Sequence, residues 1–333
     1  MSDIILYISI IIVSGIVGSR IRAYRDKLGW TSKIQTLAII VLVVLMGARM
    51  GSNDEVIENL GTIGITAFVM TIAMMLGSVI CLFIVRKALG FTKDAKIASL
   101  HADDLEKFAL EEEAEEEQKE KQGGGIDKMT VIIFISVVIG MAAGYFVARP
   151  IFGDNIATFD DAASLGIKIG LCVLMVFVGL DLGLEGTVLK MMKEAGWRIL
   201  VFPFACIVGT LIGAVICGLV FNLSMPEALA IGAGFGWYSL APGIIMDAGF
   251  ITASAISFLH NVMREIFSIL LMPLVADKVG YIEAGCMPGA PAMDVCLPIT
   301  NRATHGQAVT YGFITGVLMS FLVPIMVPIF IAL

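Results

Sequence analysis

Long apolar runs are the feature that most limits what this chain can fold into. A helix needs about 20 apolar residues to cross roughly 30 Å of hydrocarbon. The mean hydropathy of +0.93 and the 15% of charged residues exclude an ordinary water-soluble fold. The sequence therefore predicts an all-α polytopic membrane protein with about eight transmembrane helices. The eight predicted spans are residues 4–20, 34–51, 62–85, 129–149, 163–182, 197–222, 251–276 and 307–331.

Two further apolar stretches, residues 227–249 and 282–303, are long enough to enter a bilayer but are interrupted by glycine and proline. The first contains Gly232-Ala233-Gly234-Phe235-Gly236 and the second contains Pro288-Gly289-Ala290-Pro291. Both residue types disfavour a continuous helix. We interpret the two stretches as broken or re-entrant segments, and their composition leaves open whether they cross the membrane or turn back within it.

The distribution of basic residues predicts the orientation in the membrane, because lysine and arginine collect on the cytoplasmic side. The loop after the first span is basic, whereas the loop 51–61 carries only acidic charges. Applied to the successive loops, this rule places both termini outside and residues 86–128 in the cytoplasm. Full crossing of both broken segments would not change this result.

Acidic residues concentrate in residues 101–127, which hold 11 of the 29 Asp and Glu residues. Outside this stretch the charges nearly balance, so no basic surface for nucleic acid is expected. The run Glu111–Glu117 precedes Gly123-Gly124-Gly125, which favours a solvated helix or flexible tether over a regulatory or cation-binding site. The predicted domains are a first membrane unit (1–85), a cytoplasmic acidic tether (86–128), a second membrane unit (129–225) and a C-terminal core (226–333).

An internal repeat relates the two membrane units. A shift of 132 residues places 41–51 over 173–183, and each copy ends in G-x-x-x-G within the second of three spans. Such motifs can simply allow close helix packing. Three spans per copy would, however, invert the second copy relative to the first. Inverted repeats combined with broken segments are typical of secondary transporters.

Glu265 lies midway through the predicted span 251–276. A charge there costs roughly 2.5–3.5 kcal/mol on insertion scales and suggests a function. Helical spacing places Asn261, Glu265 and Ser268 on one face, and His260 with Arg264 on an adjacent face. Arg264 and Glu265 are therefore not expected to form a simple pair. Glu265 either finds a fixed partner that orients the bundle or exchanges between a proton and a cationic substrate.

Three aspartates are weaker candidates. Asp54 follows the second span in an acidic loop and could be an ordinary surface residue, while Asp181 and Asp294 lie near membrane depth. Arg49 and Asp181 occupy matching repeat positions and could pair. Asp181 with Asp294 would suit an intramembrane aspartyl protease, but the G-x-G-D context of that class is absent.

The broken segments add groups that could bind a substrate. Gly236, Trp237, Tyr238 and Ser239 follow the first glycine cluster, and Asp294 follows the second. The aromatic rings could lie at the membrane interface or contact an ammonium group through cation–π interaction. Freed carbonyls, a carboxylate and an aromatic face suit an amino or alkylammonium cation better than an anion. No nucleotide-binding loop G-x-x-x-x-G-K-S/T is present, and neither a cofactor nor a metal is expected.

These residues resemble a known family. The run Gly234-Phe235-Gly236-Trp237-Tyr238-Ser239 is the most specific part of the resemblance. It is followed by Arg264-Glu265 in a span, by Gly285-Cys286, Met293-Asp294 and Leu297-Pro298, and by Gly312-Phe313-Ile314 and Leu322-Val323-Pro324. The chain is similar to the lysine exporter LysO family of prokaryotic inner membranes, strongly over residues 226–331. Met46-Gly47, Asp54 and Asn59 extend the similarity toward the N-terminus.

The resemblance implies export of L-lysine and toxic lysine analogues, driven by an ion gradient. The family's two essential membrane carboxylates map onto Asp54 and Glu265. Both termini outside and eight spans are also implied. The segment Ser239–Gly243 and the acidic tether depart from the family pattern.

The sequence therefore predicts a multi-pass inner-membrane antiporter that exports L-lysine in exchange for protons, with no enzymatic activity. Sodium coupling, a homodimer and other cationic amino acids stay open. The alternatives are a transporter of similar architecture that moves an organic anion or another small solute and, at much lower weight, the protease.

Overall fold

The computed structural model describes residues 2–21, 30–95, 128–184 and 197–333. These residues form helices joined by turns, with no strand among them. Seven of the predicted spans correspond to helices that are long and apolar enough to cross a membrane. The first predicted span, residues 4–20, lies within a 19-residue helix. The predicted all-α polytopic architecture is confirmed.

Two three-helix units form the outer parts of the molecule. The first unit contains α1 (Ser2–Arg20), α2 (Trp30–Ser52), the short α3 (Asp54–Glu58) and α4 (Leu60–Ala88). The second contains α6 (Lys128–Ala143), the π-helical turn η2 (Gly144–Ala148), α7 (Arg149–Phe152), the 3-10 turn η3 (Gly153–Asn155), α8 (Ile156–Leu184) and α10 (Trp197–Phe221).

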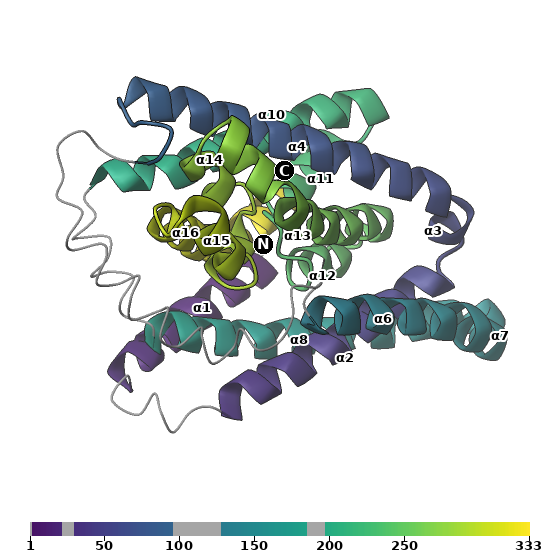
Figure 1. Ribbon diagram of the computed structural model, residues 1–333. Helices are drawn as coiled ribbons and strands as arrows, with labels where there is room; N and C mark the ends of the chain where they lie inside the picture. The colour runs from purple at the N-terminus through teal and green to yellow at the C-terminus, as the bar shows by residue number, and fades with distance from the viewer. Residues whose placement is uncertain (1, 22–29, 96–127, 185–196) are drawn as a thin grey trace.

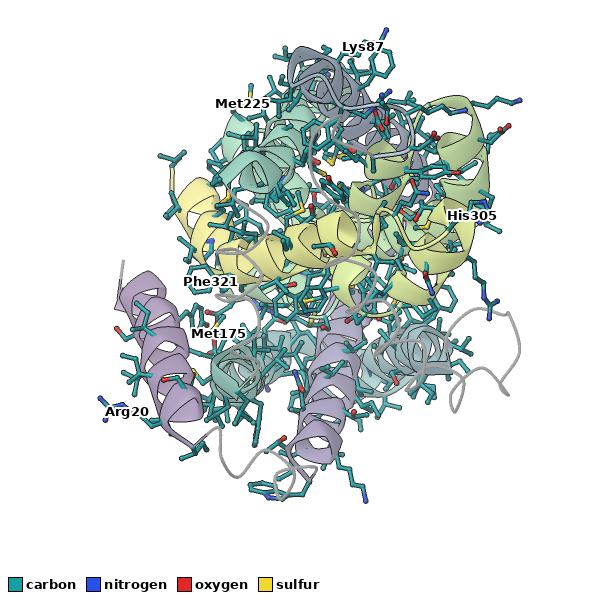
Figure 2. All side chains as sticks on the ribbon, turned by 60° about the vertical axis from the view of Figure 1, so that its left-hand side comes forward. Arg20, Lys87, Met175, Met225, His305 and Phe321 are labelled. Carbon is teal, nitrogen blue, oxygen red and sulfur yellow. The ribbon has the colours of Figure 1, made fainter. Side chains whose placement is uncertain are left out.

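The C-terminal part forms the centre of the molecule. It contains α11 (Met225–Gly232), α12 (Ala241–Asp247), α13 (Ile251–Lys278), α14 (Tyr281–Cys286), the 3-10 turn η4 (Ala290–Met293), α15 (Leu297–Thr304) and α16 (Val309–Ile331). Figure 1 shows α4 and α10 on one side of this centre and α1, α2, α6 and α8 on the other. In Figure 2, Lys87 of α4 and Arg20 of α1 mark opposite edges, and Phe321 of α16 lies between them.

The outer helices pack in pairs that combine the two units. Helix α1 packs along α8, α2 along α6, and α4 along α10. The first, second and third helices are α1, α2 and α4 in one unit and α6, α8 and α10 in the other. The first helix of each unit therefore packs against the second helix of the other unit, and the two third helices pack together. The pairing is what two related three-helix units would produce, and it supports the repeat predicted from the sequence.

Glycine lines the contact in each pair. Gly47 of α2 lies against the backbone of Gly140, Gly18 of α1 lies against that of Gly183, and Gly77 of α4 lies against Gly209. Each glycine lets two helix backbones touch, which is how small residues stabilise helix pairs in lipid. The G-x-x-x-G motifs of the sequence thus act in packing.

Both broken segments are re-entrant hairpins. We call α11, the turn 233–240 and α12 hairpin 1, and α14 through α15 hairpin 2. Helix α10 runs antiparallel to α4, so hairpin 1 starts at the end of the bundle where α2 finishes. It returns to that end, because Arg49 Nη1 donates to the Met246 carbonyl at 3.0 Å and Tyr7 Oη donates to Asp247 at 2.7 Å.

Hairpin 2 starts and finishes at the opposite end of the bundle. Arg86, in the last turn of α4, donates from Nη2 to the Val279 carbonyl at 3.2 Å, directly before α14. After α15 the chain returns to the same region, where Tyr311 Oη donates to the Ala95 carbonyl at 3.3 Å. The two hairpins therefore enter the bundle from opposite ends.

A buried ion pair fixes hairpin 2 to the first unit. Arg86 is 5% exposed and its Nε lies 2.5 Å from Glu283 Oε1, which is fully buried. Phe91 and Ala95, which lie in the stretch predicted as the tether (86–128), are also buried. The acidic run itself lies outside the described residues.

The predicted pairing of Arg49 with Asp181 is wrong. Arg49 Nε lies 3.4 Å from Asp160 Oδ1, near the start of α8. Asp181 lies at the other end of that helix, about 30 Å away at 1.5 Å per residue. A position match between inverted repeats places the two residues at opposite ends of the bundle, so they cannot meet.

We predict that separating Arg86 from Glu283 destabilises the protein. Arg86→Met or Glu283→Leu alone leaves one buried charge without its partner, which typically costs about 3–5 kcal/mol. The double variant should recover most of this loss in the free energy of unfolding, measured by circular dichroism in detergent micelles. Equal losses in all three variants would show that the pair adds nothing beyond packing.

We also predict that the close contact of α4 with α10 is sensitive to a single added side chain. A valine at Gly77 would clash with the Gly209 backbone, and overpacking of this kind typically costs about 1–3 kcal/mol. Gly64→Val in the same helix is the matched control, since no atom lies within 4 Å of an added Cβ there. Thermal unfolding of both variants compares the two positions, and similar losses would contradict the proposed role of the contact.

Candidate functional site

The tips of the two hairpins meet inside the bundle. The Ala290 amide of hairpin 2 donates to the Phe235 carbonyl of hairpin 1 at 2.9 Å. Gly289 has φ +82° and lies directly against that carbonyl, while Gly236 has φ +97° and lies against Pro288 and Pro291. A Cβ at either glycine would clash with the other hairpin. Glycine is required at both tips because the backbones touch and because φ is positive there.

Helix α13 carries polar side chains past this crossing. Asn261 is fully buried, and its Oδ1 accepts a hydrogen bond from the Gly236 amide at 2.7 Å. Its Nδ2 donates to the Ser257 carbonyl at 2.8 Å and to the Ser257 hydroxyl at 3.1 Å. The side chain of Asn261 thus fixes the tip of hairpin 1 to α13, since it takes up an amide that the broken helix leaves unsatisfied.

Arg264 lies one turn further along α13 and is fully buried. Its guanidinium donates to the Met287 carbonyl from Nε at 3.3 Å and from Nη2 at 3.1 Å. Nη1 and Nη2 both lie 3.3 Å from the Thr210 hydroxyl of α10, and Nη2 also contacts the Cys206 sulfur at 3.8 Å. Arg264 therefore joins α10, α13 and the tip of hairpin 2.

Glu265 is 1% exposed and lies about 100° around α13 from Arg264. It interacts electrostatically with Cys296 of hairpin 2, and so does Asp294. Asp294 is exposed and accepts a hydrogen bond from the Val295 amide at 2.5 Å. Glu265 and Asp294 thus both influence Cys296 electrostatically, while Arg264 contacts Thr210 and Met287.

The aromatic residues after the tip of hairpin 1 are half-buried. Trp237 Nε1 donates to the Ser239 hydroxyl at 3.0 Å, and Ser239 is itself buried. Trp237 and Tyr238 both pack against the hydrophobic core. Their predicted cation–π role stays a prediction.

Asp54 lies apart from this buried group. It is the first residue of α3, its side chain is 73% exposed, and it forms an ion pair with Arg149 of α7. The structure therefore does not bring Asp54 and Glu265 together. Asp181 belongs to α8, but its side chain lies outside the described residues.

Some contacts at the crossing could not be found from the sequence pattern. Thr210 lies within an apolar span, and Met287 contributes only its backbone oxygen, so neither gives a signal. Helical spacing places His260 on a face of α13 but does not indicate its partner. Its Nδ1 lies 3.0 Å from the Thr71 hydroxyl of α4, and its Nε2 is buried without a hydrogen-bond partner among the described residues.

A family model described as lysine exporter LysO matches residues 134–331, which include both hairpins, α13 and α16. The protein named "Lysine exporter LysO" of Escherichia coli K12 is 31% identical over 198 residues, covering 59% of this chain and 62% of that protein. The protein named "Putative lysine exporter" of Haemophilus influenzae is 29% identical over 194 residues, covering 55% of this chain and 90% of its own length.

No solved structure matches the chain. The family match covers more than half of it and contains all the residues at the hairpin crossing. The chain belongs to the lysine exporter LysO family.

Proposed function

We propose that this protein exports L-lysine, and toxic lysine analogues, from the cytoplasm in exchange for protons. The observation that carries the proposal is the buried carboxylate of Glu265, on the helix that passes the crossing of two opposed re-entrant hairpins. Transporters commonly bind substrates where such irregular backbone lies inside the membrane. Family membership supports the choice of an amino acid as substrate.

The orientation that we propose follows the basic residues. Arg86, Lys87 and Arg20 mark the cytoplasmic end, which is then the end where hairpin 2 begins and returns. Asp54 and hairpin 1 lie at the outer end, and both termini are outside. The substrate would enter along hairpin 2 and leave along hairpin 1, with the crossing between them.

The proposed exchange depends on competition at one carboxylate. Glu265 binds either an ammonium group of lysine or a proton, because each of these stabilises a carboxylate group at a buried position. Asp294, which shares Cys296 as a neighbour, would receive the substrate on the cytoplasmic side. Asp54 would accept the incoming proton at the outer end and return to its ion pair with Arg149.

Substrate and coupling ion can be tested in proteoliposomes. We expect labelled L-lysine to undergo counterflow and to be driven by an imposed pH gradient, and we expect no drive from a sodium gradient. A pH gradient of one unit supplies about 1.4 kcal/mol per proton. Transport of an organic anion without lysine would contradict the proposed substrate, and drive by sodium alone would contradict the proposed coupling.

We predict that Glu265→Gln abolishes exchange while leaving the fold intact. Removing the exchangeable proton should lower lysine-driven proton release in everted vesicles at least about tenfold, equivalent to about 1.4 kcal/mol. Asp277→Asn is the matched control, because Asp277 lies on the same helix with its side chain 67% exposed and pairs with Lys278. Proton release at the original rate in Glu265→Gln would refute the exchange role.

We predict different effects for the two members of the Asp54–Arg149 pair. Asp54→Asn should lower transport at least about tenfold if its carboxylate accepts the coupling proton. Arg149→Gln should keep more than about half of the rate, because an exposed ion pair contributes little to stability. Equal losses in both variants, measured as lysine efflux from cells, would show that Asp54 acts only through the ion pair.

A further inference from the structure

The guanidinium of Arg264 is a full positive charge enclosed in the centre of the bundle. It is 0% exposed, and an arginine in a protein keeps its charge. Its partners are a threonine hydroxyl, a backbone carbonyl and a cysteine sulfur, all of them neutral acceptors. Among the residues that the structure describes, no carboxylate lies within ion-pair distance of it.

A second buried arginine in this chain shows the usual arrangement. Arg86, 5% exposed, contacts the carboxylate of Glu283. Placing a charge in a low-dielectric interior costs several kcal/mol, and this cost is offset best by an opposite charge with good geometry. Arg264 is buried more completely than Arg86 and lacks that compensation. Its position therefore needs an explanation beyond packing.

The donor geometry of Arg264 suits a carboxylate. Both terminal nitrogens, Nη1 and Nη2, converge on the single hydroxyl oxygen of Thr210 at 3.3 Å. These are long hydrogen bonds to one atom, whereas a carboxylate offers two oxygens to the two parallel donors of a guanidinium. The Thr210 hydroxyl already donates to the Cys206 carbonyl at 2.8 Å, so it remains satisfied if it no longer accepts from Arg264.

The location agrees with a substrate group at this point. The guanidinium carbon lies 3.4 Å from the position that a Cβ on Gly289 would occupy, directly beside the contact of Gly289 with the Phe235 carbonyl. Arg264 thus touches the crossing of the two hairpins, where any movement of either hairpin changes its surroundings. Glu265 is the next residue in the chain and lies about 100° further around the helix. The positive and negative groups therefore lie near one another without neutralising each other.

We propose that Arg264 binds the carboxylate of the amino-acid substrate while Glu265 binds an ammonium group of the same molecule. This assignment rests on the proposed function and specifies which part of the substrate each residue recognises. It predicts selection for α-amino acids over diamines and amino-acid amides, because only the amino acid supplies both opposite charges.

The assignment can be tested with L-lysine and L-lysinamide, which differ only in that the carboxylate is replaced by a neutral carboxamide. Their affinities for the purified protein are measured by isothermal titration calorimetry. We expect the wild-type protein to bind L-lysine at least about tenfold more tightly than L-lysinamide, since a bidentate ion pair is lost with the amide. Arg264→Gln should lower the lysine affinity to about that for lysinamide, and Arg264→Lys should give a smaller preference than the wild type.

Arg149→Gln is the control for removal of a positive charge, and it should keep the wild-type ratio of affinities. Circular dichroism in detergent shows whether each variant is folded. If Arg264→Gln is not folded, the test rests on the ratio of the affinities for L-lysine and L-lysinamide in Arg264→Lys and in the wild-type protein. Equal wild-type affinities for lysine and lysinamide, or an unchanged ratio in the Arg264 variants, would overturn the inference. Absence of lysine binding by the wild-type protein would instead refute the proposed function.

Discussion

The contact between the tips of the two hairpins is the constraint on which the centre of this structure depends. Two helices are broken at membrane depth, and each break frees amides and carbonyls that lipid cannot satisfy. The Ala290 amide donates a hydrogen bond to the Phe235 carbonyl, and Asn261 accepts a hydrogen bond from the Gly236 amide. Met287 directs its freed carbonyl to Arg264. Asn261 and Arg264 of α13 thus each satisfy a backbone group that the breaks leave free.

The buried charges of the structure are of two kinds, those that form an ion pair with each other and those that do not. Arg86 and Glu283 compensate each other's charge where hairpin 2 meets α4. Arg264 and Glu265 are equally buried but face different elements, α10 with the hairpin 2 tip in one case and the Cys296 region in the other. The proposed binding of an amino acid requires this separation, because its carboxylate and its ammonium group would contact Arg264 and Glu265 respectively.

Apolar length predicted the long helices well, because the bilayer allows few other structures. Glycine and proline predicted where two helices break, but re-entry could not be predicted. It depends on long-range contacts such as Arg49 with the Met246 carbonyl, and neither residue type signals the other. Helical spacing correctly separated Arg264 from Glu265. It could not identify Thr210, a single hydroxyl in an apolar run, or the pairing of Asp54 with Arg149 on another helix.

The glycine contacts of the outer helices limit how such a molecule can change shape. Where Gly47 meets Gly140, or Gly77 meets Gly209, backbone touches backbone and there are no side chains to rearrange. Each outer pair of helices is therefore expected to move as one rigid body. The outer pairs pack less extensively against α13 and α16 than their own two helices pack against each other, so relative movement is expected at those contacts.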